Sequence, residues 1–385
     1  MSSDESWANG SAVGPLTGVR VVEIAGFMSV PFAAMMLADL GAEVVKVEPP
    51  RGDPFRRFGR PRQAMSAVFA NVNRGKRSVA LDLKDESDRA HLLAVLREAD
   101  VVLSNWRPGV AGRLGLDDDV LASCNPRLVR VYVSGFGAEG PDAAKPAFDS
   151  VIQARSGMAW AQGDDQAPAL TVGYLVDKLT AAMAAQATLA ALYERTRTGQ
   201  GVAIDLSMFD ATAYIDFPEL FAMRTFVDDE PGDARNRQMS ANRPLRAADG
   251  WLVVTAVTGD QVRGAMAALG RPDWAEELMA ERDGARLTAR LAERIESQTR
   301  ARTVAECLDV FERHDVPAAE CVDPDEHLAD AQTVHGELYE IVEHPTLGRV
   351  REVRYPARWR DRGLLRGLGR APLLDADRER VLGSP

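Results

Sequence analysis

The chain has 385 residues and carries a formal net charge of −11 at pH 7. That length exceeds what one typical hydrophobic core supports, so two domains are expected, and the acidic balance argues against a nucleic-acid-binding protein. Its hydrophobic share of 46% and its charged share of 27% are ordinary for a water-soluble globular protein.

Cysteine usage and the N-terminal segment bear on where the protein works. Cys124, Cys307 and Cys321 are widely separated and lack CxxC spacing, which argues against a disulfide framework and for a reducing compartment. The segment 1–15 carries acidic rather than basic side chains, unlike a secretory signal, and no apolar run approaches the roughly 20 residues that cross a bilayer. We therefore expect a cytoplasmic protein that does not bind a membrane.

Strand-like and helix-like segments alternate through the first half of the chain. The pattern predicts a strand at 19–25, a helix that begins near Pro31 and ends at Gly41, and a strand at 42–48. It continues with the strands 78–83, 100–106 and 128–137 and the helix 85–99. Strand, helix and strand of these lengths form parallel pairs, so the fold class is α/β, with a Rossmann-like large domain built on a parallel sheet.

Several cofactor motifs are missing from this α/β pattern. The first predicted strand leads into Gly26 and the bulky Phe27 instead of the glycine fingerprint GxGxxG, so a nicotinamide or flavin cofactor has no support. The five histidines show no ligand spacing, and there is no P-loop, HExxH or GxSxG motif. We expect no metal and no tightly bound cofactor.

The second half of the chain has a different texture. A helix predicted at 179–195 is apolar nearly all round, so it must be buried in a domain or at a subunit interface, and a strand is predicted at 202–211. The region 218–325 combines one clear strand with several amphipathic helices and is interpreted as a smaller α+β domain. The large domain then comprises 1–217 together with 326–385.

A basic stretch stands out in this acidic protein. Between Arg51 and Arg77 the chain has eight basic residues and a single acid, Asp53. Such a stretch fits a small polyanionic ligand, and it fits equally well a solvated loop whose arginines pair with carboxylates elsewhere.

Asp177 stands directly before the predicted apolar helix. It could be an N-cap that accepts backbone N–H bonds and contributes about 1 kcal/mol to stability. It could equally be a nucleophile that the positive end of the helix dipole keeps ionised. Position alone leaves both readings open.

The sequence resembles the class III (CaiB/BaiF-type) coenzyme A transferases, the family of formyl-CoA and carnitine CoA transferases and of α-methylacyl-CoA racemase. The resemblance starts with PLTGVRVVEIAGFMSVPFAAMMLADLGAEVVKVEPPRGD at 15–53 and continues, in the family's order, over nearly the whole chain. The further blocks are NRGKRSVALDLK (73–84), SNWRPGVAGRLGL (104–116), VSGFGAEGP (133–141), PAFDSVIQARSG (146–157), RTGQGVAIDLSMFDA (197–211), GWLVVTAV (250–257), HDVPAAECVD (314–323), EHPTLGRVR (343–351) and RAPLLDADRERVLG (370–383).

The resemblance implies a CoA transferase that moves coenzyme A from an acyl-CoA to a carboxylic acid through an aspartyl anhydride and an aspartyl–CoA thioester. Asp177 matches the family's catalytic aspartate. The positions that match CoA-binding residues are Phe27, Met28, Ser29, Leu81, Lys84, Asn105, Trp106, Arg107, Arg113, Pro146, Ala147, Phe148 and Asp149. CoA and acyl-CoA would be substrates, and the family implies an interlocked homodimer in which each ring-like subunit threads through the other.

The chemistry of these side chains agrees with the implied ligand. Lys84, Arg107 and Arg113 can form charge-assisted bonds with phosphates, and the aromatic positions offer apolar faces to the adenine or the pantetheine arm. An alternative for Arg107 and Arg113 is a surface pairing with the acids at 117–119.

One position separates transfer from racemisation. Racemases of this family place a histidine in the block before the aspartate, where this chain has Phe148, and a phenyl ring cannot exchange a proton. Transfer is therefore favoured. The alternatives are an acyl-CoA racemase or isomerase, an intramolecular CoA transferase, and a non-catalytic CoA-binding protein.

The chain departs from the family in two places. The stretch at 237–251 reads RQMSANRPLRAADGW and lacks the glycine run that closes the site in formyl-CoA transferases. Pro49 replaces a basic residue that some members present to CoA.

Overall fold

The structure is a computed structural model that describes residues 14–63, 65–164, 166–228, 243–361, 363–364 and 369–383. Residue contacts divide the chain into two compact units. The first comprises Met1–Ser156, Leu170–Ile215 and Gly336–Pro385, and the second comprises Gly157–Ala169 and Asp216–His335. The segments 157–169 and 326–335 thus group with the second unit, whereas the sequence pattern placed them in the first. Most of the acidic segment at 1–15 lies outside the described residues.

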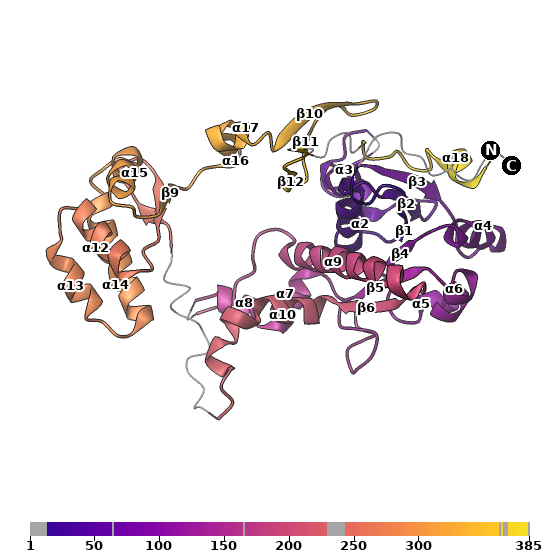
Figure 1. The fold of residues 1–385 in the computed structure, drawn as a ribbon, viewed down its shortest axis with the longest axis horizontal. Helices are drawn as coiled ribbons and strands as arrows, with labels where there is room; N and C mark the ends of the chain where they lie inside the picture. The colour runs from indigo at the N-terminus through magenta and orange to yellow at the C-terminus, as the bar shows by residue number, and fades with distance from the viewer. Residues whose placement is uncertain are drawn as a thin grey trace. The chain divides into compact units, whose positions relative to one another are not determined.

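A sheet of six parallel strands forms the centre of the first unit, in the order β3-β2-β1-β4-β5-β6 (Figure 1). The strands are β1 (Arg20–Ile24), β2 (Glu43–Glu48), β3 (Lys76–Ala80), β4 (Val101–Ser104), β5 (Val129–Ser134) and β6 (Ala203–Ser207). Val22 of β1 lies in register with Val45 of β2 on one side and Val102 of β4 on the other. This order is that of a Rossmann fold, so the predicted α/β class is confirmed.

The first unit also contains helices. They are α2 (Ser29–Asp39), η1 (Pro54–Arg57), α3 (Ala67–Asn73), α4 (Glu86–Arg97), α5 (Val110–Arg113), α6 (Asp118–Cys124), α7 (Asp149–Ser156), α9 (Leu175–Thr198), α10 (Met208–Leu220) and α18 (Arg378–Leu382). Leu92 and Leu96 of α4 and Leu121 of α6 are buried in one hydrophobic cluster with Val22 and Val45. α2 packs along α9, which also contacts β5 and β6.

Within the part of the chain that the structure describes, α9 is the one helix long and apolar enough, by length and composition, to cross a bilayer. The expectation that no segment approaches this length is therefore corrected. The buried residues of α9 are small, among them Thr180, Ala181 and Ala184, so the helix can lie close to α2 and the sheet. It ends at Gly199, whose φ of 72° is the left-handed conformation of a helix C-cap.

The strand predicted at 202–211 is too long. β6 stops at Ser207, and the chain continues directly into α10. The residues 208–211 are helical because the Ser207 hydroxyl accepts the backbone N–H of Asp210, which satisfies one of the free donors of the first turn.

The C-terminal segment returns to the first unit. A two-stranded hairpin, β10 (Tyr339–His344) and β11 (Gly348–Val353), is followed by the short pair β12 (Arg358–Trp359) and β13 (Gly363–Leu364). The chain then runs along the free edge of β3. Asp375 and Asp377 accept the backbone N–H groups of Ala80 and Ser78 at 2.8 and 3.0 Å. An edge that could pair with another chain is thereby covered.

The second unit combines a small sheet with helices, as an α+β domain does. An antiparallel sheet holds β7 (Leu245–Arg246), β8 (Trp251–Val254) and β9 (Ala318–Glu320). The helices are α8 (Met158–Gln162), η2 (Ala222–Arg224), α12 (Gly259–Ala268), α13 (Asp273–Met279), α14 (Gly284–Thr299), α15 (Val304–Arg313), α16 (Pro324–Ala329) and α17 (Ala331–His335). Leu252, Met266, Leu278, Ile295 and Phe311 form its buried core.

Candidate active site

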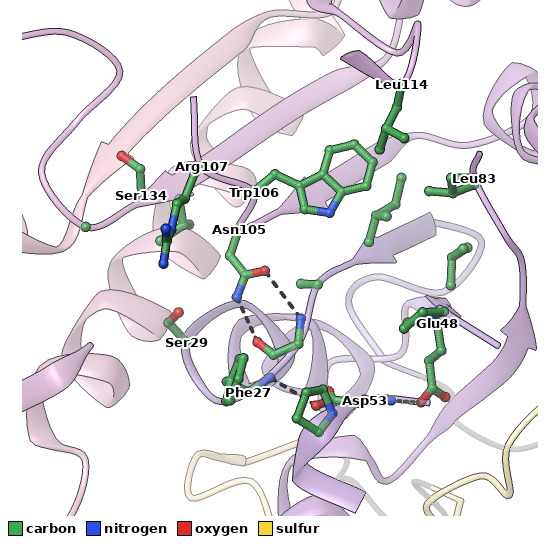
Figure 2. Close-up of a pocket in the computed structure, with 18 of the residues that line it drawn as sticks. Phe27, Ser29, Glu48, Asp53, Leu83, Asn105, Trp106, Arg107, Leu114 and Ser134 are labelled. Carbon is green, nitrogen blue, oxygen red and sulfur yellow. Dashed lines mark hydrogen bonds between the residues drawn. The ribbon is translucent and has the colours of Figure 1, made fainter. Parts of the chain in front are cut away.

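A cleft of about 470 Å³ opens in the first unit beyond the carboxyl ends of the parallel strands (Figure 2). The loops after β1 and β4 form its centre, and β1 and β4 are the neighbouring strands at which the strand order reverses. In a doubly wound fold, ligands bind at this switch point. The loops after β2, β3 and β5, the first turn of α9 and the start of α10 complete the lining.

Most of the predicted site residues line this single cleft. They are Phe27, Ser29, Leu81, Lys84, Asn105, Trp106, Arg107, Ala147, Phe148 and Asp177. Segments spread from the loop after β1 to the first turn of α9 therefore meet at one place. Asp82, Leu83, Pro50 and Lys145 also line the cleft and were not singled out from the sequence.

Four predicted residues do not belong to the lining. Met28 is 5% exposed and packs in a core cluster with Phe55 and Phe69. Arg113 and Pro146 are exposed on the surface, and Asp149 is buried. Prediction by position in a motif does not show which of several neighbouring side chains faces a cleft.

Asp177 is the third residue of α9 and not its N-cap. The cap position is Tyr174, which makes no capping side-chain bond, so the N-cap reading is wrong. Asp177 shares the cleft lining with Ser29, whose backbone N–H and hydroxyl act to lower the pKa of its carboxyl group. The side chain of Asp177 is therefore partly desolvated, with the polar groups of Ser29 nearby.

The surroundings of Asp177 change its acidity. Burial, reinforced by the nearby charge of Asp149, raises the pKa of Asp177 to about 7, although the bonds from Ser29 act in the opposite direction. The expectation that this carboxylate stays ionised is corrected, because its raised pKa leaves it only partly ionised near neutral pH. Near neutral pH, both protonation states of Asp177 are populated.

Asp149 holds the backbone of the first turn of α9. Its Oδ2 accepts the N–H of Asp177 at 3.0 Å, and its Oδ1 accepts the side-chain amide of Gln153. The Oε1 of Gln153 in turn accepts the N–H of Thr171 at 2.9 Å. Asp149 thus positions Asp177 and, by its charge, raises the pKa of Asp177.

The model of the family described as CoA-transferase family III matches residues 16–378. The chain belongs to CoA-transferase family III. The resemblance found in the sequence is thereby confirmed, and the chain is an enzyme of this class.

Curated relatives of this family III enzyme carry CoA-transferase names. The succinyl-CoA:mesaconate CoA-transferase of Haloarcula hispanica is 31% identical over 406 residues, with 96% of each chain covered. The succinyl-CoA–D-citramalate CoA-transferase of Chloroflexus aurantiacus is 31% identical over 345 residues, with 88% of this chain and 86% of that one covered. The acetyl-CoA:oxalate CoA-transferase of Acetobacter aceti is 45% identical over 202 residues, and that match spans about half of either chain, 52%.

Solved structures of related proteins share the fold. A CaiB/BaiF family protein from Brucella suis has a TM-score of 0.80 at 29% identity, with 94% of this chain and 97% of that one covered. The protein Rv3272 from Mycobacterium tuberculosis has a TM-score of 0.81 at 28% identity, with 95% and 98% covered.

Half of the basic residues in the basic stretch of this family III enzyme are buried in the structure. Arg56 forms two bonds with Glu48 and stacks on the ring of Phe69, with 3.9 Å between Cζ and the ring centroid. Arg74 pairs with Asp39. Lys76 is fully buried against Glu23, whereas the arginines at 51, 57, 60 and 62 are exposed. The reading as Arg–carboxylate pairs therefore holds for Arg56 and Arg74.

Cationic side chains for a phosphate-bearing ligand come from other parts of the lining. Lys84 and Arg107 are exposed at the cleft, and neither forms an ion pair among the described contacts. The alternative pairing of Arg107 and Arg113 with the acids at 117–119 is not seen in the described part of the chain. Asp118 pairs instead with Arg130 at 2.7 Å.

Aromatic rings wall the cleft next to Asp177. The Phe27 ring meets those of Phe55 and Phe148 edge to face, with centroids 5.5 and 5.3 Å apart. Trp106 lies deeper and packs on the cluster that contains Leu83 and Leu114 (Figure 2). Such a wall provides apolar surface for an extended ligand and lowers the local dielectric around a reacting carbonyl.

Proposed function

We propose that this enzyme moves CoA from an acyl-CoA thioester to a small carboxylic acid, with Asp177 as the transient acyl carrier. The observation that carries the proposal is the position of the Asp177 carboxylate, which lines the cleft at the strand ends together with the predicted CoA-binding residues. The names of the relatives pair acetyl-CoA or succinyl-CoA with oxalate, D-citramalate or mesaconate. We carry over only the class, a CoA thioester donor and a carboxylic acid acceptor.

The chemistry begins with ionised Asp177. A carboxylate oxygen attacks the thioester carbonyl carbon, the C–S bond breaks, and CoA leaves as a thiolate while an aspartyl–acyl anhydride forms. The thiolate then attacks the aspartyl carbonyl, which releases the donor acid and leaves an aspartyl–CoA thioester. The acceptor carboxylate attacks this thioester and expels the thiolate again. Attack of the thiolate on the acceptor's carbonyl releases the new acyl-CoA and restores Asp177.

Ser29 is suited to stabilise the charge that develops in these steps. Its backbone N–H and hydroxyl act to lower the pKa of Asp177, and both residues line the same cleft. When the thiolate attacks the acylated aspartate, one of those oxygens becomes an oxyanion, and a preorganised donor at such a place typically contributes about 10²–10³ in rate. Ser29 is thus the candidate for the backbone donor that the chemistry requires.

Water must be kept from the anhydride and the thioester. The stretch at 237–251, which lacks the family's glycine run, lies outside the described residues over 237–242.

A proton shuttle for racemisation has no support in this cleft. Phe148 occupies the position of the racemase histidine, and its ring packs against Phe27. None of the described residues that line the cleft is a histidine. Incorporation of solvent deuterium at the α-carbon would instead favour racemisation, and transfer without a free acceptor would favour the intramolecular reaction.

We also propose that the enzyme works as a cytoplasmic homodimer that binds CoA as a substrate and not as a resident cofactor. In the first unit, large apolar side chains are exposed on α9 and α10, with Tyr193 69% and Tyr214 72% exposed. Surfaces of this kind are often buried in subunit contacts. A monomer in sedimentation equilibrium at micromolar concentration would contradict the dimer.

The variant Asp177→Asn tests the transfer proposal. An amide of the same shape cannot form the anhydride, so we expect a folded protein that still binds CoA and whose transfer rate falls by at least about 10³-fold. Isotope exchange between labelled free acid and acyl-CoA measures this loss. Turnover near the wild-type rate would remove Asp177 from the mechanism, and absent exchange in the wild type across a panel of acids would favour a non-catalytic CoA-binding protein.

A further inference from the structure

The backbone at Phe27, at the mouth of β1, adopts a conformation that side-chain-bearing residues avoid. Its φ is 65°, in the left-handed region, although Phe27 is not a glycine. Such a residue persists only where its surroundings enforce the conformation, and strained residues of this kind cluster at functional sites.

After the turn at Phe27, successive side chains enter different surroundings. One residue later, the Met28 side chain enters the core cluster with Phe55 and Phe69. The next residue, Ser29, begins α2 and lines the cleft together with Asp177. The placement of the Ser29 N–H and hydroxyl relative to Asp177 therefore depends on the conformation two residues upstream.

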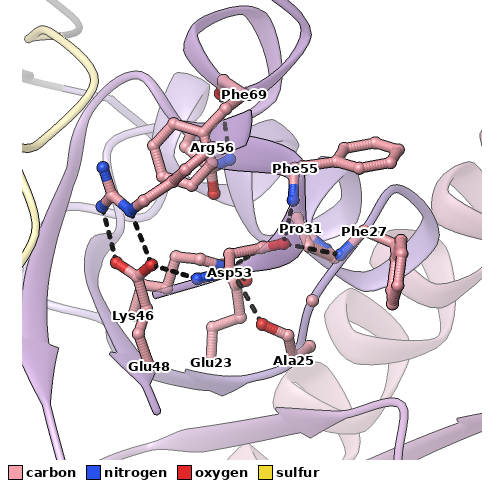
Figure 3. A network of polar contacts seen from close by, with 12 residues as sticks. Glu23, Ala25, Phe27, Pro31, Lys46, Glu48, Asp53, Phe55, Arg56 and Phe69 are labelled. Carbon is pink, nitrogen blue, oxygen red and sulfur yellow. Dashed lines mark hydrogen bonds and ion pairs between the residues drawn. The ribbon is translucent and has the colours of Figure 1, made fainter. Parts of the chain in front are cut away.

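Side chains from three other segments hold the peptide groups around this turn. Lys46 donates to the carbonyl of Ala25 at 2.9 Å, and Asn105 accepts from the N–H and donates to the carbonyl of Gly26 at 3.3 and 2.7 Å. The N–H of Phe27 donates to Oδ1 of Asp53 at 3.2 Å (Figure 3).

Asp53 lines the cleft, but its carboxylate is bound to this turn and to neighbouring groups of the protein. It is 2% exposed, and its Oδ1 also accepts the N–H of Phe55 at 2.9 Å. Its Oδ2 lies 2.9 Å from the ammonium of Lys46, and its own N–H donates to Glu48. Lys46 is in turn paired with buried Glu23 at 2.6 Å. Both carboxylate oxygens are therefore engaged inside the protein.

We propose that Asp53 is a positioning residue for the transfer reaction: it enforces the left-handed turn at Phe27 and thereby aims the Ser29 donors at Asp177. The role rests on the proposed function of Asp177. It adds to that function a buried network, from Glu23 through Lys46 to Asp53, that fixes the geometry of the nucleophile without touching it.

The variant Asp53→Asn tests this role, because the direction in which it shifts the acidic limb of the pH–rate profile distinguishes positioning from a simple loss of charge. The amide has only one acceptor atom, so it cannot accept the Phe27 N–H and also offer an acceptor to the Lys46 ammonium. The turn then loosens and Ser29 moves relative to Asp177. Ser29 lowers the pKa of Asp177, so the acidic limb of the rate profile moves to higher pH. If the variant acted only by removing the negative charge of Asp53, the acidic limb would instead move to lower pH. Asp149, whose charge raises the pKa of Asp177, is unchanged in this variant.

The positioning role also predicts that Asp53→Asn affects kcat more than KM. We expect kcat of Asp53→Asn to fall by at least about tenfold, because a donor to the developing charge is displaced, with KM for acyl-CoA changed by less than about threefold. Asp39→Asn is the matched control. Asp39 is an equally buried carboxylate, paired with Arg74 and away from the cleft, so its loss lowers stability without moving the acidic limb.

A matched pair at Phe27 tests the strain directly. Glycine adopts a φ of 65° freely and alanine does not, while both remove the ring. Combined with Asp53→Asn, Phe27→Gly should therefore keep a kcat about tenfold above that of Phe27→Ala. With Asp53 intact, the two Phe27 variants should differ less, because Asp53 enforces the turn.

Two outcomes would overturn the positioning role of Asp53. One is equal kcat for the two double variants, and the other is an acidic limb of Asp53→Asn that does not move or moves to lower pH. Neither outcome would affect the proposed role of Asp177 as the acyl carrier. If Asp53→Asn does not fold, the thermal unfolding of the single variants Phe27→Gly and Phe27→Ala is compared instead. A higher Tm for Phe27→Gly than for Phe27→Ala supports the enforced turn, and the reverse order overturns it. An active Asp177→Asn variant would defeat the proposed function itself.

Discussion

Two opposing influences act on the carboxyl group of Asp177. Burial and the charge of Asp149 favour its protonated form, and the Ser29 donors favour its ionised form. A carboxylate that is poorly solvated but hydrogen-bonded on one side is a better nucleophile than one in water, because less solvation is lost on attack. The acidity of this residue is therefore a property of three side chains from α2, α7 and α9.

The pH dependence of transfer follows from this acidity. Only ionised Asp177 can attack the thioester, and its pKa is raised to about 7. We expect kcat/KM to fall about tenfold per pH unit below this value and to level off above it. Initial rates between pH 5 and 9 with one acyl-CoA donor measure the limb, and a flat profile down to pH 5 would contradict this acidity.

Protein stability should depend on pH through the same group. The pKa of Asp177 is raised in the folded state relative to the unfolded chain, so the wild type loses stability as pH rises from about 4 to about 7. Asp177→Asn removes this dependence. We expect the variant to gain about 2–4 kcal/mol relative to the wild type between pH 4 and pH 8. Urea unfolding of both proteins at the two pH values measures the difference, which a constant offset would refute.

Among the elements, the edge of β3 shows how a distant segment supports the cleft. Asp375 and Asp377 satisfy the N–H groups of Ala80 and Ser78, and Arg378 donates to the carbonyl of Ala80 at 2.6 Å. The cleft residue Leu81 follows directly. The C-terminal segment therefore fixes the end of β3, from which one wall of the cleft begins.

Removing this cover should weaken both the fold and ligand binding. The double variant Asp375→Ala and Asp377→Ala leaves two backbone donors without their partners, so we expect a loss of about 2–4 kcal/mol in the free energy of unfolding and a raised KM for acyl-CoA. Chemical denaturation and steady-state kinetics measure the two effects. Glu139→Ala, a change at an exposed loop, serves as the control, and equal stability of the two variants would argue against the cover.

Local patterns in the sequence predicted elements better than their ends. The β-branched runs around Val22, Val45 and Val102 predicted three strands, because a strand buried on both faces leaves a continuous apolar run. The change from β6 to α10 at Met208 was missed, because it depends on one serine hydroxyl. The left-handed turn at Phe27 was also missed, since the bonds that enforce it come from Asp53 and Asn105, which are remote in sequence.

For the whole molecule, the resemblance to a family predicted the site more fully than the residues alone. It brought Asp177 together with segments up to 150 residues away in the sequence, and the structure places most of them around one cleft. It did not separate lining residues such as Trp106 from supporting ones such as Asp149. That distinction depends on which way each side chain points once the sheet has formed. The grouping of 157–169 with the second unit likewise depends on contacts that no local pattern records.

Trapping of the acylated enzyme tests the central claim most directly. Wild-type enzyme is incubated with an acyl-CoA donor and then with hydroxylamine, which attacks activated aspartyl carbonyls. Peptide mass spectrometry should find a hydroxamate at Asp177 that depends on the donor and is absent from Asp177→Asn. Labelling of another carboxylate, or of none in an enzyme that is turning over, would contradict the account.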